Sequence, residues 1–128
     1  MKLLFDTHAF IWWDSAPANL PASVLALCQD PANILLLSVV SAWEMQIKSH
    51  LGKLKFASPL GEIIAGQQQA NNIEILPITL DHVLNLETLP DHHKDPFDRL
   101  LVAQAMVEGL PLVSADAVLD AYGIVRLW

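Results

Sequence analysis

The sequence contains a single cysteine, Cys28, which excludes both a disulfide framework and a cysteine-based metal site. It also lacks any apolar run of the roughly 18 residues that a bilayer-spanning helix needs, since the longest candidate, 34–40, has the length of a strand. Glycine-rich phosphate loops of the GxGxxG or GxxxxGK[ST] type are absent. The acid at Asp6 interrupts the first apolar run, which a signal-peptide core would not tolerate. We therefore expect a cytoplasmic protein without a membrane anchor.

Basic residues are scarce as well. Seven lysines and arginines are outnumbered by fourteen aspartates and glutamates, which gives a net charge of −7 with neutral histidines. Proteins that bind nucleic acids usually neutralise phosphates with Lys and Arg, so this balance indicates that a metal ion or a basic partner supplies positive charge. Lys48, Lys53 and Lys55 lie within eight positions, beside His50. This cluster either contacts a phosphate backbone or forms only a solvated helix end and loop.

Apolar residues, by contrast, are abundant: they make up 53% of the 128 positions, against 16% for charged residues. This composition predicts one well-filled domain, 1–128. Five short apolar runs without polar alternation are separated by segments of helical pattern, which predicts a parallel five-stranded sheet with helices on both faces, a three-layer α/β fold. The expected strands are 2–5, 34–37, 73–76, 112–114 and 124–127, and the expected helices are 9–13, 21–28, 39–50, 58–72, 79–89, 96–108 and 116–123.

Four acids are expected at one edge of this sheet. Asp6 ends the first strand and Asp116 follows the fourth, while Glu44 and Asp98 lie on helices that begin at the same edge. Parallel α/β folds bind ligands at this edge, where the strands have their carboxyl ends. Two unit charges about 4 Å apart repel by about 4 kcal/mol at an effective dielectric constant of about 20. Converging carboxylates would therefore have to point apart, share protons or hold cations.

The type of ligand atom indicates which cation would fit. An all-oxygen set suits Mg²⁺ or Mn²⁺ rather than Zn²⁺, and Mg²⁺ usually keeps positions open for a substrate phosphate. Such an ion activates water and stabilises a leaving oxygen, so the acids predict cleavage of phosphodiester bonds. Trp12, Trp13 and Trp43 lie next to the same edge, where they either fill the core or stack on bases.

Each acid also has an interpretation in which it only stabilises local structure. Glu44 completes a capping box with Ser41 if its helix starts late. Asp6 closes a strand-to-helix turn by binding nearby backbone amides. Asp116 caps the short helix that follows it. These alternatives stay open at the level of single residues.

The segment 91–105 is the most informative stretch of the chain. Asp95 is the natural N-cap and Pro96 the first residue of an apolar helix, which places Asp98 in the first turn, where a carboxylate favours the helix dipole. Arg99 either contacts phosphate or pairs with Asp95. The sequence 91–93, Asp-His-His, also matches a short motif of another phosphoesterase class, but it lies in a loop rather than after a buried strand.

Four segments resemble the motifs of the PIN-domain family, in the order in which that family carries them. They are 4–8 (LFDTH), 38–44 (SVVSAWE), 93–105 (HKDPFDRLLVAQA) and 112–116 (LVSAD). The resemblance extends over 2–128 and is strongest to the small VapC-type toxins of toxin–antitoxin modules. It implies a PIN fold and an Mg²⁺- or Mn²⁺-dependent endoribonuclease, usually homodimeric and held inactive by a cognate antitoxin.

Carried over residue by residue, the resemblance implies one acidic metal site. Asp95 would be a fifth ligand or only the helix cap, and Thr7 and Ser114 would support the ligands through their hydroxyl groups. The ligands themselves would be Asp6, Glu44, Asp98 and Asp116. Few basic side chains are available to line a path for RNA, namely those of Lys48, Lys53, Lys55, Lys94 and Arg99.

A second function is consistent with the same acids. The protein would then be a non-catalytic PIN-like module whose acidic rim binds a basic partner, as the net charge suggests. An antitoxin tail that places an Arg or Lys in the rim would satisfy both hypotheses, because it would displace metal and inhibit. Cleavage of RNA by partner-free protein, with and without chelator, distinguishes the two.

Overall fold

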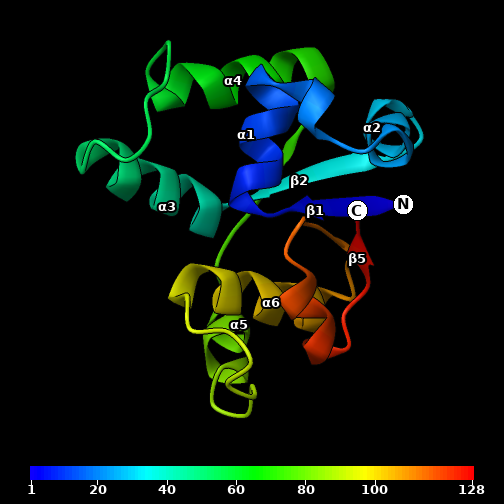
Figure 1. The fold of residues 1–128 in the computed structure, drawn as a ribbon, viewed down its shortest axis with the longest axis vertical. Coiled ribbons are helices and arrows are strands. Elements are labelled where there is room, and N and C mark those ends of the chain that lie inside the picture. The colour runs from blue at the N-terminus through cyan, green and yellow to red at the C-terminus, as the bar shows by residue number, and fades with distance from the viewer.

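The computed structural model describes all 128 residues and contains one parallel sheet with the strand order β3-β2-β1-β4-β5 (Figure 1). The central strand β1 pairs with β2 through Leu3 and Leu35, and with β4 through Phe5 and Val113. The chain adds β2 and β3 on one side of β1 and then β4 and β5 on the other, so the strand order reverses beside β1. The strands are β1 (Lys2–Phe5), β2 (Ile34–Ser38), β3 (Glu74–Leu76), β4 (Leu112–Val113) and β5 (Arg126–Leu127).

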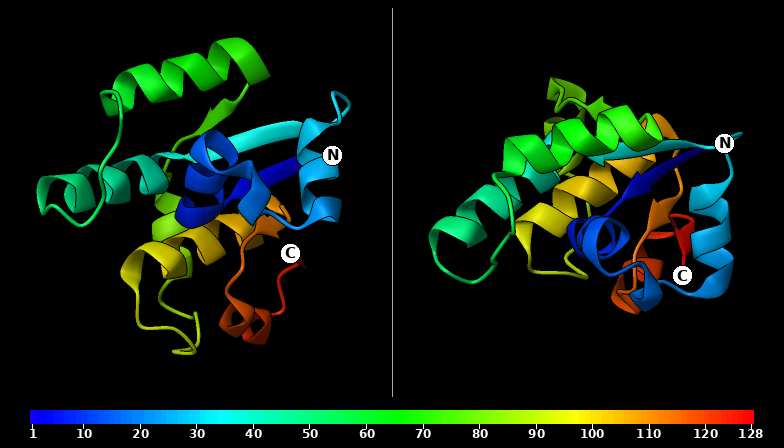
Figure 2. Two further views of the ribbon diagram at one scale, coloured as in Figure 1. Left: turned by 45° about the horizontal axis from the view of Figure 1, so that its top comes forward. Right: turned by 90° about the horizontal axis from the view of Figure 1, so that it is seen from above.

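Helices cover both faces of the sheet, which confirms the predicted three-layer α/β fold (Figure 1). Helix α3 continues from the end of β2, and its connection to α4 lies on the side of the molecule away from both termini (Figure 2). No helix is both long and apolar enough to cross a bilayer. The helices are α1 (Thr7–Ser15), α2 (Ala22–Gln29), α3 (Val39–His50), α4 (Leu60–Asn71), α5 (Leu80–Asn85) and α6 (Pro96–Glu108), with short 3₁₀ helices η1 (Pro17–Asn19) and η2 (Ala117–Tyr122).

The two cores explain why the strands show no polar alternation. Leu3 and Phe5 point to one face of β1 and pack in a cluster with α1, α2 and α3, whereas Leu4 points to the other face and packs with α6 and η2. All three side chains are fully buried. Because both faces are covered, the central strands are apolar on both sides, apart from Lys2 at the exposed start of β1 and Ser38 at the end of β2.

Several element boundaries differ from the predicted ones by about two residues. Helix α1 begins at Thr7 rather than at residue 9, because Asp6 caps it by accepting the Ala9 amide at 2.8 Å. Helix α4 begins after Pro59. Helix α6 begins at Pro96 as predicted and ends at Gly109, whose φ of 64° is the left-handed conformation that glycine adopts most readily.

Candidate metal centre

Asp6 lies where β1 passes into α1, at the carboxyl edge of the sheet. Its side chain is 8% exposed, and one of its oxygens, Oδ1, accepts the Ala9 amide. Burial raises the pKa of the Asp6 carboxyl above its usual range, although hydrogen bonds from Ser114 and the Ala9 amide oppose that rise. Asp6 is therefore both a helix cap and an acid held in a poorly hydrated place.

Glu44 reaches the same edge from α3. Ser38 caps this helix by accepting the Val40 amide at 3.0 Å, so the helix starts early and the capping box between Ser41 and Glu44 is wrong. Glu44 instead lies in the second turn, with a side chain that is almost completely buried. A role as a helix cap does not account for this acid.

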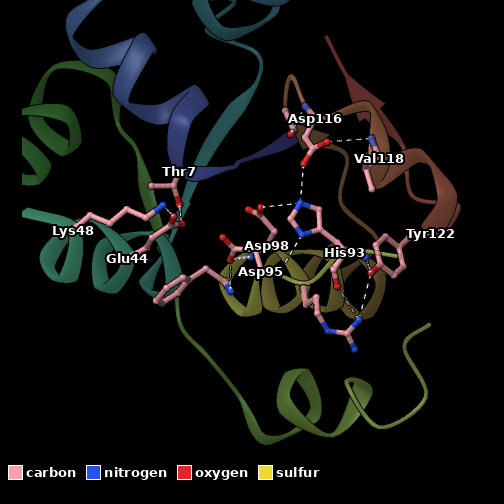
Figure 3. A network of polar contacts seen from close by, with 12 residues as sticks. Thr7, Glu44, Lys48, His93, Asp95, Asp98, Asp116, Val118 and Tyr122 are labelled. Atoms are coloured by element: carbon pink, nitrogen blue, oxygen red, sulfur yellow. Dashed lines mark hydrogen bonds and ion pairs between the residues drawn. The ribbon is translucent and has the colours of Figure 1, made fainter. Parts of the chain in front are cut away.

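Two side chains, those of Thr7 and Lys48, hold the Glu44 carboxylate in place (Figure 3). The Thr7 hydroxyl donates to Oε1 at 2.6 Å, and Lys48 pairs with Oε2 one turn along α3. The single hydroxyl hydrogen of Thr7 is used in the bond to the Glu44 carboxylate. The Ser41 hydroxyl, 3.0 Å away, is therefore the donor to the Thr7 oxygen. The resemblance implies that the Thr7 hydroxyl supports a ligand, and the hydrogen bond from Thr7 to Glu44 is a contact of that kind.

The first turn of α6 presents two acids with different roles. Asp95 is the N-cap, and its Oδ1 accepts the amides of Phe97 at 2.8 Å and Asp98 at 3.1 Å. The Asp98 carboxylate accepts no backbone amide, and its Oδ2 lies 3.3 Å from Nε2 of the His93 ring. Capping therefore explains the position of Asp95 but not that of Asp98.

The electrostatics of Asp98 show that the acids converge. Burial, followed by the negative charges of Asp95, Asp6 and Glu44, raises the pKa of the Asp98 carboxyl from 3.8 to about 7, while His93 opposes the rise. These acids come from β1, α3 and α6 and are separated by up to 92 positions in the sequence, from Asp6 to Asp98. Their mutual repulsion at Asp98 is the effect that the proposed site requires.

Asp116 joins the cluster through a histidine that sequence reasoning did not select. Its Oδ1 caps η2 by accepting the Val118 amide at 3.1 Å, and its Oδ2 lies 2.8 Å from Nε2 of His93 (Figure 3). The same Nε2 lies 3.3 Å from Oδ2 of Asp98. One potential ligand atom from each of these three residues lies within 4.8 Å of the other two, and Asp6 and Glu44 lie outside this tighter group.

Lys48 is the cation that faces the acids from the opposite side. The hydrogen bond with Glu44, and then the charges of Glu44, Asp95 and Asp98, raise the pKa of the Lys48 ammonium. Lys53 is exposed in the following loop. Of the predicted lysine cluster, Lys48 thus belongs to the acidic site rather than to a solvated helix end.

Arg99 is engaged with the loop that precedes α6. Its guanidinium donates to the carbonyl oxygens of Pro90 at 2.9 Å and Leu89 at 3.3 Å, and its nearest acid is Asp91 at 3.2 Å. The pairing with Asp95 is therefore wrong, because the first turn of α6 directs Arg99 back to this loop. Contact with a phosphate stays a prediction.

Two of the tryptophans have different surroundings. Trp43 is 54% exposed and packs edge-on against Phe97, with ring centroids 5.2 Å apart. For Trp43 the core-filling interpretation is wrong, because α3 extends away from the sheet and leaves this ring on the surface. Trp13 packs against the core and donates to Gln67 at 3.0 Å.

The donor set fits a hard divalent cation. Carboxylates from separate elements provide oxygen ligands, and burial, together with repulsion by Asp95, Asp6 and Glu44, already raises the pKa of Asp98 and so favours its neutral form. A dication would relieve this repulsion and favour the ionised form of each. The residues able to hold it are Asp6, Glu44, Asp98 and Asp116, with the free oxygen of Asp95 beside them.

Comparison with known proteins agrees with the fold and with the motifs. The PIN domain family model matches residues 3–125. Ribonuclease VapC22 of Mycobacterium tuberculosis is 27% identical over 115 residues, which cover 89% of this chain and 86% of that protein. The structure of VapBC2 from Rickettsia felis bound to a promoter DNA fragment aligns with a TM-score of 0.72 at 14% identity, over 99% of this chain and 98% of that chain. VapBC-1 from nontypeable Haemophilus influenzae aligns with a TM-score of 0.68 at 15% identity, over 99% and 97%. Since the family model spans nearly all of its residues, the chain belongs to the PIN domain family.

Proposed function

We propose that this protein is a metal-dependent endoribonuclease, the toxin of a toxin–antitoxin pair, which hydrolyses RNA phosphodiester bonds at the acidic site. The observation that carries the proposal is the convergence of Asp6, Glu44 and Asp95 on Asp98, whose pKa is raised to about 7. Perturbed acids in a cluster of this kind mark functional sites more often than structural ones. The family match and the ribonuclease VapC22 support the same reaction.

Mg²⁺ or Mn²⁺ is the cofactor that the oxygen ligands favour. When bound, such an ion would supply an activated water and would stabilise the charge on the leaving oxygen. The protein's own contribution is to hold the carboxylates. Thr7 and Lys48 hold the two oxygens of Glu44. Asp6 and Asp116 are held by the helix amides that they cap, those at the start of α1 and of η2.

The RNA would approach a surface with few cations. Lys48 is the positive group closest to the acids and is placed to contact a phosphate when it leaves Glu44. Trp43, half-exposed against Phe97, offers a face for stacking of an unpaired base beside the site. This arrangement favours single-stranded or looped RNA, because its bases are free to stack.

The decisive assay is cleavage of structured RNA by purified, partner-free protein in Mg²⁺, in Mn²⁺ and in EDTA. We expect activity with either ion, none in EDTA, and a loss of at least about 100-fold in Asp98→Asn, since one carboxylate of the cluster is removed. Glu87→Gln is a matched control, because Glu87 is exposed and makes no side-chain hydrogen bond. Full activity of a folded Asp98→Asn protein, or cleavage in EDTA, would refute the proposal.

One observation favours the alternative of a non-catalytic module that binds a basic partner. The acids already accept a lysine ammonium, that of Lys48, so a basic side chain of a partner would find similar contacts. The similar solved chains belong to VapBC complexes, and we propose that the partner here is a cognate antitoxin with a basic tail. We also propose a homodimer, which light scattering of the purified protein tests. Binding of antitoxin without any RNA cleavage by the free protein would favour the alternative.

A further inference from the structure

We propose that His93 is a positioning residue of the acidic site, which holds Asp98 and Asp116 together as a hydrogen-bond donor and is not itself a ligand of the metal. The inference deepens the proposed function, because it concerns the same site. It starts from the place of the imidazole ring, which lies between the two carboxylates (Figure 3).

The hydrogen bonds of the ring determine its tautomer. The backbone N–H of Asp95 donates to Nδ1 of His93 at 3.0 Å, so Nδ1 carries a lone pair and no proton. The proton of the neutral ring is then on Nε2, which lies 2.8 Å from Oδ2 of Asp116 and 3.3 Å from Oδ2 of Asp98. The carboxylate oxygens of Asp116 and Asp98 accept hydrogen bonds from this N–H group. The contacts of the ring with Asp95, Asp98 and Asp116 are therefore all consistent with a single tautomer.

The same tautomer argues against ligation of a metal by His93. A metal bound at Nε2 would need the ring proton on Nδ1, where the Asp95 amide hydrogen already points. Turning the ring over about χ2 would put Cδ2 in the place of Nδ1 and Cε1 in the place of Nε2, so the bonds with Asp95 and Asp116 would both be lost. The ring is 19% exposed, and its backbone amide donates to the Tyr122 hydroxyl at 2.9 Å, so the loop holds the residue in this orientation.

A donor at this place has a clear structural consequence. Asp98 lies on α6 and Asp116 follows β4, and each offers an oxygen within 4.8 Å of the other's. The Nε2–H group shared by both offsets their repulsion and fixes the direction of the two oxygens that face it. Supporting hydrogen bonds of this kind orient metal-binding carboxylates, and their removal typically costs about 10- to 100-fold in metal affinity.

The two roles of His93 differ in what they predict for metal preference. A nitrogen ligand would strengthen binding of Mn²⁺ relative to Mg²⁺, because imidazole suits transition metals. A donor that only positions carboxylates supports both ions alike. His93→Gln separates the roles, because the glutamine amide places an N–H donor near the position of Nε2 but provides no imidazole nitrogen. His92→Phe is the matched control, since it removes an exposed imidazole from the same loop but keeps an aromatic ring against Tyr122.

The experiment measures Mg²⁺ and Mn²⁺ binding by calorimetry and the thermal midpoint in EDTA, for the wild-type protein and for His93→Ala, His93→Gln and His92→Phe. We expect His93→Ala to weaken both ions by a similar factor of about 10 or more and to lower the midpoint in EDTA. His93→Gln should recover a large part of both losses, and His92→Phe should behave as the wild type. Loss of Mn²⁺ affinity with Mg²⁺ affinity unchanged, or a silent His93→Ala variant, would overturn the inference.

A second measurement needs no variant. The ¹⁵N shifts of the His93 ring in the wild-type protein report which nitrogen is protonated, and we expect a protonated Nε2 and an unprotonated Nδ1 both in EDTA and in Mg²⁺. An unprotonated Nε2 in Mg²⁺ would show ligation instead. None of these readouts uses RNA, so a protein that binds metal as expected but cleaves no RNA would refute the proposed function and leave the role of His93 standing.

Discussion

Replacing Asp98 by Asn should stabilise the metal-free protein at neutral and alkaline pH. The pKa of this carboxyl is about 7 in the folded protein, against 3.8 for an unperturbed group. Since one pKa unit corresponds to about 1.4 kcal/mol, the ionised carboxylate destabilises the fold by at most about 4 kcal/mol. The side chain is 24% exposed, so solvent and salt reduce this figure but do not remove it.

The sign of the effect follows from proton binding. Because the pKa is raised in the folded state, the protonated carboxyl contributes stability that is fully present below pH 3.8 and is lost as the pH rises to about 7. The Asn variant does not titrate, so its advantage should grow from less than about 1 kcal/mol at pH 4 towards about 4 kcal/mol at pH 8. Loss of a carboxylate near the start of a helix costs only about 0.3–1 kcal/mol, and the gain therefore dominates.

Urea unfolding in EDTA between pH 4 and pH 8 measures this advantage through the fluorescence of the four tryptophans. Mg²⁺ should reduce this advantage, because an ion at 100 times its dissociation constant stabilises the wild-type protein by about 2.7 kcal/mol, which offsets more than half of it. Glu87→Gln, which also removes one negative charge, should show neither effect. A gain of equal size at pH 4 and pH 8, or no gain at all, would mean that burial and the neighbouring acids do not disfavour the ionised Asp98 carboxylate.

Three further substitutions test the groups around the acids. Thr7→Val removes the donor to Glu44 and should lower the free energy of unfolding by about 1–3 kcal/mol, measured with urea, and weaken Mg²⁺ binding. Lys48→Met removes the cation that competes for Glu44. It should cost about 3–5 kcal/mol in urea unfolding in EDTA, because the buried Glu44 carboxylate loses its partner, and it should strengthen Mg²⁺ binding in calorimetry, whereas weaker binding would exclude that competition. Gln104→Leu leaves the buried Ser38 hydroxyl without its acceptor and should cost about 2–3 kcal/mol in the same urea assay, and an unchanged unfolding curve would contradict it.

The fold was predictable because the strand residues are apolar on both faces, and such a pattern is visible in the sequence. Leu3, Leu4 and Phe5 are apolar on both faces of β1, which only a sheet covered on both sides requires. The boundaries were harder to predict wherever a polar residue acts as a cap. Asp6 starts α1 two positions early for this reason, and no periodicity reveals such a choice.

The acids of the site were predictable, but the groups that hold them were not. Topology alone brings Asp98 close to Asp6, because both belong to elements that meet at the carboxyl edge. His93 reaches Asp116 across 23 positions only because the loop before α6 takes one particular path. Its neighbours in the sequence suggested another enzyme class, and the one available signal was its place two residues before the cap Asp95.

The contrast between a capping acid and a metal-binding acid, which the sequence leaves open, does not persist in three dimensions. In each of Asp6, Asp95 and Asp116, one oxygen, Oδ1, accepts a hydrogen bond from a backbone amide of the helix that follows. The second oxygen of Asp116 faces His93 and the cluster. A cap bond fixes the direction of a carboxylate that would otherwise rotate, so it orients the remaining oxygen without consuming it. Asp98 has no such bond and depends on His93 for its orientation. The acid with the weakest local role is thus one whose pKa is raised by burial and by the charges of its neighbours, as expected if position within the cluster, rather than helix stability, determines where this carboxylate lies.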